Sequence, residues 1–272
     1  MEAVQAIAAI DVVENLPRRR IKLYNARADP FSLPDVEFRS RYRFQKDTMN
    51  YIIDLVRDDI VVDQRGCGTT PELQVLTAIR CWGRREVQDD AGELHGLSQP
   101  TVICDATLQI MDLVARWRGS THDSRIFTES SIKQRFERRE FRGRLLGDSG
   151  YRLEPYLFTP ITRPQNVAEE HYSEAHISTR NTIERCFGVW KQRFQCLLHG
   201  MSVKMENIKP TIVALAILHN IAIKREGQID FDAEEQLHHP ALPEEDAHIE
   251  GGHRANINNA FLRAFVARHF NN

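Results

Sequence analysis

Two acidic residues have neighbours that suit a divalent-metal site for phosphodiester cleavage. Asp148 follows the apolar run Leu145–Leu146 beside Gly147, and Glu184 lies in a segment of helical character. Cleaving a phosphodiester requires a strong nucleophile and a stabilised leaving oxygen, and two Mg²⁺ or Mn²⁺ ions supply both. Such hard ions bind carboxylate oxygens and retain several waters. The two acids therefore indicate metal-dependent hydrolysis if a third acid joins them.

Each candidate acid also has an ordinary structural interpretation. Asp148 is the type of residue that closes a turn, and Glu184 is spaced to pair with Arg180 or Arg185. Asp123 precedes another helical segment and suits its N-terminal cap, so it would bind metal only if its carboxylate faces the end of the sheet. None of these residues indicates a metal site by itself, but their combination does.

Basic and acidic residues are unevenly distributed along the chain. The 272 residues allow one large domain or two small ones, and 42% are hydrophobic, which is enough for a core. The net charge of -2 gives no overall basic field, but residues 17–46, 116–144 and 178–225 are basic and residues 226–250 carry nine acids without Lys or Arg. These basic segments are either solvated faces or nucleic-acid contacts.

The cysteines and the hydropathy of the chain indicate its cellular compartment. Five cysteines without C-x-x-C spacing indicate reduced thiols in an intracellular protein. Asp11 and Glu14 interrupt any signal-peptide pattern at the start. The longest apolar stretch, Thr211–Ile223, is shorter than the ~20 residues that span a bilayer, so no membrane association is expected.

The amino-terminal part is predicted to be helical. A basic, extended stretch over Ile21–Phe44 should precede helices over Lys46–Arg57 and Leu73–Trp82, with Pro71 in a first turn. A further helix over Val87–Leu94 and one capped by Ser98 would form a helix-turn-helix, which can contact DNA. Its contacts would come from Ser98, Gln99 and Thr101. The alternative is a helical subdomain that only packs.

The remainder alternates strands and helices, which favours an α/β core. Val102–Ala106 and Leu108–Trp117 fit two strands or one helix, and their β-branched residues slightly favour strands. The other predicted elements are a helix over Ser124–Phe136, strands at Arg144–Leu146 and Leu157–Pro160, a long helix or two over His176–Leu197, a buried helix over Thr211–Ile223 started by Pro210, and an end helix over Ala255–His269 with Ile257, Phe261 and Phe265 on one face.

Several motifs in one order resemble Harbinger-type transposases and the nucleases domesticated from them. The resemblance covers about residues 41–225. Its carrying motifs are Cys104-Asp105-Ala106, Gly119-Ser120-Thr121-His122-Asp123-Ser124-Arg125-Ile126-Phe127, Leu146–Tyr151, Leu157–Pro160, Tyr172-x-x-x-His176, and Arg180–Gly188 with Lys191-x-Arg193-Phe194.

The resemblance implies an RNase H-like core with a DDE-type acidic site. Asp148 matches the second catalytic acid, Glu184 the last, and Asp123 an additional acid near the metal, which would be Mg²⁺ or Mn²⁺. Lys191 and Arg193 would lie near DNA phosphates. The family also implies a Myb-like nuclear partner protein and a location in the nucleus, with the cytoplasm as a second location.

The chain departs from the family at one point. The family's first catalytic aspartate lies in an Ile-Asp-Gly-Thr-His-like motif on the first strand, and this motif is absent between Val102 and Ile103. The sheet should therefore lack a strand and expose its edges. Asp105 is a substitute ligand by type, although a turn aspartate is its ordinary interpretation. The abrupt junction is more typical of a skipped exon or a faulty gene model than of a folded adaptation.

These observations predict five segments and two functions. The segments are a basic arm whose order the sequence leaves open (1–40), a helical helix-turn-helix-like region (41–102), an incomplete RNase H-like nuclease core (103–225), an acidic linker (226–254) and a C-terminal helix (255–272). The first function is a divalent-metal nuclease that acts on DNA. The alternative is an inactive remnant that binds DNA or a protein in the nucleus.

Overall fold

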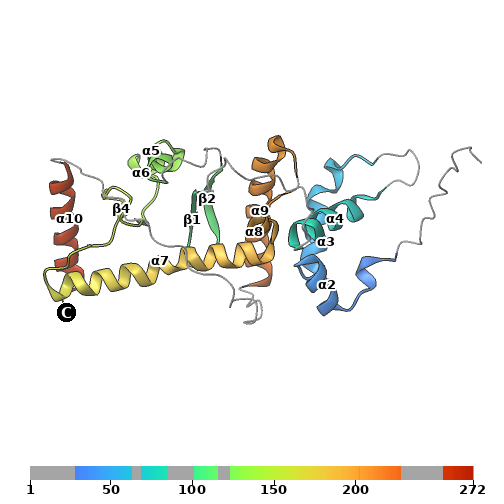
Figure 1. Cartoon of the computed structure of the whole chain (residues 1–272), viewed down its shortest axis with the longest axis horizontal. Coiled ribbons are helices and arrows are strands. Elements are labelled where there is room, and N and C mark those ends of the chain that lie inside the picture. The colour runs from blue at the N-terminus through green and yellow to red at the C-terminus, as the bar shows by residue number, and fades with distance from the viewer. Residues whose placement is uncertain are drawn as a thin grey trace, which may run out of the picture. The chain divides into compact units, whose positions relative to one another are not determined.

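The computed structural model describes residues 28–62, 69–84, 101–115, 123–201, 203–227 and 254–271. The chain divides into two units, Met1–Pro34 and Asp35–Asn272. In the first unit the described part holds a short 3-10 helix, η1 (Pro30–Ser32), capped by the Asp29 side chain through the N–H of Phe31. All the elements described below belong to the second unit (Figure 1).

Three helices that contact one another open the second unit. They are α2 (Asp35–Tyr42), α3 (Lys46–Val56), which continues into the 3-10 helix η2 (Arg57–Asp59), and α4 (Pro71–Gly83). Helices α3 and α4 confirm the predictions for these segments, including Pro71 in the first turn of α4. The predicted extended stretch over Ile21–Phe44 is wrong from Asp35 onward. Pro34, the last proline of this stretch, lies directly before α2, and Phe38 and Tyr42 of that helix are buried.

The hairpin that follows confirms the prediction of two strands. β1 (Thr101–Cys104) and β2 (Ile110–Val114) pair antiparallel, and Thr101 lies opposite Val114. Thr101 and Val102 are therefore in a strand, which corrects the placement of Thr101 in a helix-turn-helix. Ser98, Gln99 and the predicted helix over Val87–Leu94 lie outside the described residues.

A second, parallel pair carries the segment that leads to Asp148. Two helices, α5 (Asp123–Thr128) and α6 (Ser131–Glu137), replace the single predicted helix because the Ser130 hydroxyl caps a new helix there. β3 (Leu145–Leu146) and β4 (Leu157–Phe158) then pair in parallel. The described strands thus form two separate two-stranded sheets within a mostly helical α/β fold, in place of one continuous mixed sheet.

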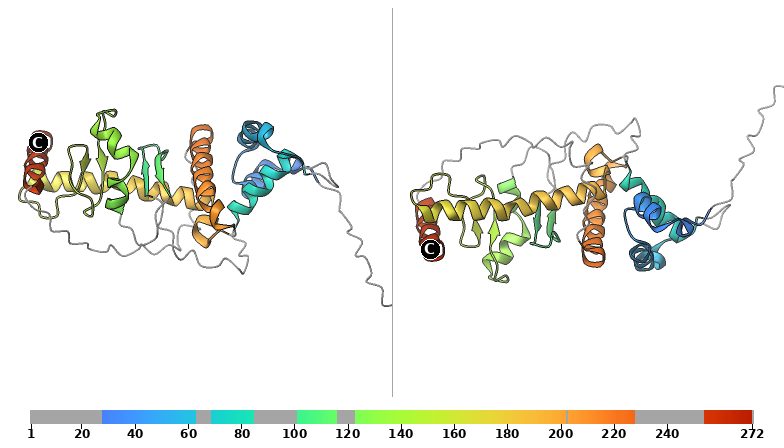
Figure 2. Two further views of the ribbon diagram at one scale, coloured as in Figure 1. Left: turned by 90° about the horizontal axis from the view of Figure 1, so that it is seen from above. Right: turned by 90° about the horizontal axis from the view of Figure 1, so that it is seen from below.

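The long helix α7 (Val167–Arg193) contacts β1, β3, α8 (Cys196–His199) and α9 (Met205–Glu226), as Figure 2 lets the reader follow. It begins nine residues earlier than predicted, because the Asn166 side chain caps it by accepting the N–H of Glu169. Helix α9 also begins earlier, so Pro210 lies inside it and does not start it. Ile208, buried before this proline, anchors the first turn.

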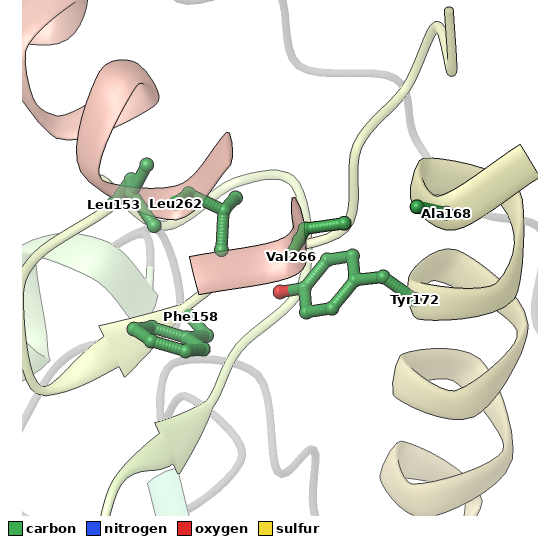
Figure 3. Close-up of a cluster of buried hydrophobic side chains, with 6 residues drawn as sticks. All are labelled: Leu153, Phe158, Ala168, Tyr172, Leu262 and Val266. Atoms are coloured by element: carbon green, nitrogen blue, oxygen red, sulfur yellow. The ribbon is translucent and has the colours of Figure 1, made fainter. Parts of the chain in front are cut away.

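The end helix α10 (Arg254–His269) confirms the predicted element and packs against α7. Among the side chains of α10 that the structure describes, Leu262 and Val266 are buried, so the predicted face is wrong by one position at Phe261 and Phe265. Phe261 is 42% exposed, and Phe265 packs at the cluster's edge. The cluster, shown in Figure 3, joins the loop before β4, β4 itself, α7 and α10 through Leu153, Phe158, Ala168, Tyr172, Leu262 and Val266.

The four cysteines in the described part, Cys81, Cys104, Cys186 and Cys196, are free thiols. Among the described helices, no stretch is both long and apolar enough to cross a membrane.

Candidate functional site

Asp148 lies just beyond the end of β3 in a turn built by glycines. The N–H of Gly147 continues the ladder to the carbonyl of Phe158 at 2.8 Å. The N–H of Gly150 donates to Asp148 Oδ1 at 2.9 Å, and a Cβ at position 150 would lie 3.1 Å from that oxygen. The turn interpretation is therefore correct for Oδ1. Oδ2 makes no hydrogen bond to any described residue.

Glu184 lies on α7, the helix that contacts β3. Its side chain is 65% exposed, and Oε1 lies 3.7 Å from the Arg180 guanidinium, one helical turn earlier. This confirms the ion-pair interpretation. Exposed pairs of this kind contribute only ~0.2–1 kcal/mol. The carboxylate is thus accessible at little energetic cost.

The other two candidate acids differ in what the structure describes. Asp123 is the first residue of α5, and its side chain lies outside the described part. Asp105 Oδ1 accepts hydrogen bonds from the N–H of Thr107, the Thr107 hydroxyl and the N–H of Gln109 at 2.7–2.9 Å. This geometry fits a turn aspartate. Within the described residues, no three His, Cys, Asp or Glu side chains gather in a way that could hold a metal ion.

The two predicted phosphate-binding cations have unequal accessibility. Arg193 has 0% side-chain exposure, so it cannot reach a DNA phosphate from this fold, and that prediction is wrong. Its Nη1 donates to the carbonyl of Arg43 at 2.5 Å and lies 3.7 Å from Glu226 Oε2. Burial lowers the pKa of Arg193 to about 10 despite Glu226. Lys191 is half-buried, with its ammonium 5.5 Å from the Phe187 ring centroid.

A buried corner between β1 and β2 was not assigned from the sequence. Leu108 is buried with a left-handed φ of 65°. Its carbonyl accepts hydrogen bonds from His219 Nε2 at 2.8 Å and Cys186 Sγ at 3.4 Å. The Asn220 side chain bonds both the N–H and the carbonyl of Ile110, each at 2.8 Å. Helices α7 and α9 thereby fix the hairpin, and the His-Asn pair within an apolar stretch was its sequence signal.

Several pKa shifts near these strands follow from burial. Burial lowers the pKa of His219 to about 4 and also lowers the pKa of His176, whose Nε2 lies 3.2 Å from the Phe158 carbonyl oxygen. Burial raises the pKa of Asp112, on β2, although Arg135 opposes the shift. A hydrogen bond with Cys186 lowers the pKa of the Cys104 thiol and raises that of Cys186. None of these pKa shifts was predicted from the sequence.

Comparison with known proteins assigns the region that holds these residues. Residues 98–220 match the model of the DDE superfamily endonucleases. This region is a DDE superfamily endonuclease domain. The human protein named "Putative nuclease HARBI1" is 33% identical over 135 residues, which cover 48% of this chain and 38% of the human protein. The Harbinger-derived family predicted from the motifs is thereby confirmed.

Two further relatives show the same limited coverage. The Xenopus laevis protein of the same name is 28% identical over 166 residues, which cover 57% of this chain and 48% of the relative. "Protein ALP1-like" of Arabidopsis thaliana is 25% identical over 142 residues, covering 46% of this chain and 35% of the relative. The aligned part therefore spans less than half of each relative. No solved structure matches the chain.

Proposed function

We propose that the two small sheets are separated parts of one RNase H-like sheet. The antiparallel pair β1–β2 precedes the helices α5 and α6, and the parallel pair β3–β4 follows them. The strand expected to carry the first catalytic aspartate would lie between β1 and β3 and pair with both. Its absence from the sequence at Val102–Ile103 accounts for two pairs where one sheet is expected.

The function that this arrangement supports best is divalent-metal-dependent hydrolysis of DNA phosphodiesters. The observation that carries it is Asp148, held by Gly150 through one carboxylate oxygen at the end of β3, with the helix that bears Glu184 in contact with the same strand. The relatives named as nucleases add support.

The donor chemistry fits Mg²⁺ or Mn²⁺. Mg²⁺ sites in phosphate-processing proteins commonly use one or two carboxylates, with waters and substrate phosphates completing the shell. Asp148 and Glu184, with Asp123, would hold the ion. When bound, it would supply an activated water and a stabilised leaving oxygen. The chain itself orients one Asp148 oxygen through Gly150 and holds the Glu184 carboxylate 3.7 Å from the Arg180 guanidinium.

Nicking of supercoiled plasmid DNA with Mn²⁺ tests this function. Asp148→Asn and Glu184→Gln each remove a charge with little change in shape, and both should reduce nicking to background. Glu174→Gln is the matched control, since it is another exposed glutamate of α7 and should leave nicking unchanged. Equal nicking by all four proteins would assign the activity to a contaminant and remove the nuclease function.

A second function is a non-catalytic module that binds DNA or a protein in the nucleus. It is favoured by the missing first acid and by Asp105, the substitute by type, being engaged in its own turn. DNA retention that weakens with salt, in a protein that never nicks, is its expected signature. A tagged full-length chain that stays outside the nucleus, with no Myb-like protein among its bound partners, would count against this function.

A further inference from the structure

The second half of α6 and the loop that joins it to β3 form a strongly basic segment. Residues 133–144 contain six Lys or Arg against two Glu. Every cation from residue 138 onward is exposed in this segment, namely Arg138, Arg139, Arg142 and Arg144.

Only part of this charge is neutralised within the protein. Glu140 accepts from Arg135 at 2.8 Å, and Glu137 lies 3.6 Å from Lys133. Both glutamates are thus already occupied.

The remaining arginines of this segment have little or no pairing. Arg138 reaches Glu140 only at 4.0 Å. Arg139 and Arg142 form no ion pair with any described residue. Arg144 lies over the rings of Phe158 and Phe265, at 5.1 and 5.0 Å from their centroids. Three guanidinium groups therefore face solvent with surplus charge.

The segment presents these groups on an ordered backbone. Two residues beyond the end of α6, Arg139 has a φ of 59°, and its N–H donates to the carbonyl of Phe136 at 3.0 Å. The Phe136 ring lies 4.8 Å from that of Phe141 and 5.6 Å from that of Tyr156. Because the loop is already packed, binding a ligand would cost less conformational entropy than ordering a free loop.

Its place in the chain links it to the candidate site. β3 runs from Arg144 towards Asp148, and four residues of extended chain span about 13 Å. That length corresponds to roughly four phosphates along one strand of a duplex. A duplex with a phosphate at Asp148 would therefore have backbone within reach of this segment.

We propose that Arg138, Arg139 and Arg142 bind the phosphate backbone of duplex DNA next to the Asp148 site. The choice of DNA as ligand rests on the proposed function. The contact would be independent of base sequence, because guanidinium groups that meet phosphates position a duplex and do not select its bases. It replaces Arg193, which the fold buries, as the phosphate-binding element.

Fluorescence anisotropy of a labelled duplex, titrated in EDTA at several salt concentrations, tests the surface without any cleavage. The variant Arg138→Gln/Arg139→Asn/Arg142→Gln is suitable, since asparagine tolerates the left-handed backbone at position 139. Lys209→Gln/Lys224→Gln/Arg268→Gln is the matched control, as it removes three exposed charges elsewhere. Thermal melting confirms that both variants fold.

Loss of three phosphate contacts should reduce the slope of log affinity against log salt by about 3 and weaken binding at low salt by at least ~10-fold. The control should keep the slope of the wild type. Equal binding by both triple variants, or no binding by the wild type, would overturn the proposal that this surface binds DNA. Tighter binding to an RNA duplex of the same sequence would overturn its assignment to DNA. If the wild type binds the duplex, the arginine variant does not, and no protein nicks the plasmid, only the nuclease function is refuted.

Discussion

Acidification should destabilise this protein through His219. The ring has 0% exposure, and Nε2 lies 2.8 Å from the carbonyl oxygen of Leu108. That bond makes Nε2 the donor, so Nδ1 of the neutral ring carries no proton. Nδ1 is buried with no hydrogen-bond partner among the described residues. A second proton would place a charge where no acceptor lies, with Arg193 adding repulsion.

The sign and size of the effect follow from the two pKa values. Burial lowers the pKa of His219 from 6.5 to about 4, so the unfolded chain binds this proton more readily than the folded protein. The stability contribution is therefore complete above the unfolded pKa and is lost as the pH falls towards the folded one. Between pH 7 and pH 5 the loss from His219 is about 2 kcal/mol. That is a large share of a typical unfolding free energy of ~5–15 kcal/mol.

Urea unfolding followed by tryptophan fluorescence at pH 7 and pH 5 measures the loss. His219→Gln places an amide donor near the position of Nε2 and cannot titrate, so it should lose about 2 kcal/mol less than the wild type over this interval. His176 also has a lowered pKa and remains in both proteins, so its contribution cancels in the comparison. The same acid-induced loss in both proteins would refute the assignment to His219.

Three further substitutions test the packing around the site, each by the urea midpoint at pH 7. Arg193→Met leaves Glu226 buried without its cation and should cost about 3 kcal/mol, which adding Glu226→Leu should partly restore; a loss below that of Lys191→Met would contradict the buried pair. Asn220→Ala removes both hydrogen bonds to Ile110 and should cost about 2 kcal/mol, and an unchanged midpoint would show that α9 does not hold the hairpin. Asp112→Asn removes a half-buried carboxylate with a raised pKa and should stabilise the fold slightly; a clear loss would show that the attraction to Arg135 outweighs the cost of burial.

Elements with complete local signals were predictable from the sequence. Helix α4 has Thr70 as its cap and Pro71 in its first turn, and both signals lie within a few residues of the helix. The β-branched residues of β1 and β2 likewise favoured strands. The turn at Asp148 was among the interpretations weighed because the neighbouring glycines are visible in the sequence.

Features that depend on distant partners were not predictable. Arg193 resembled an exposed phosphate-binding residue, but its burial depends on Arg43, 150 positions away, and on Glu226. The inward face of α10 was predicted from Ile257, Phe261 and Phe265, which recur at a spacing of four residues. Packing against α7 and β4 selects Leu262 and Val266 instead, and the larger rings remain at the edge of the cluster.

We propose that a deletion at Val102–Ile103 divides the strands into two sheets, since each strand pair is consistent with its own sequence. If an exon was skipped, the genomic DNA between the codons for Val102 and Ile103 should hold a coding segment with an Ile-Asp-Gly-Thr-His-like motif. Continuous coding sequence across that junction would refute this explanation and make the two-sheet arrangement a property of the gene.

Mn²⁺-dependent plasmid nicking by the full chain tests the central claim most directly. Nicking by the wild type and by Glu174→Gln is expected, with background levels for Asp148→Asn and Glu184→Gln. Wild-type protein that binds DNA but never nicks it, or variants that nick as well as the wild type, would contradict the claim that these two acids form a working DDE-type site.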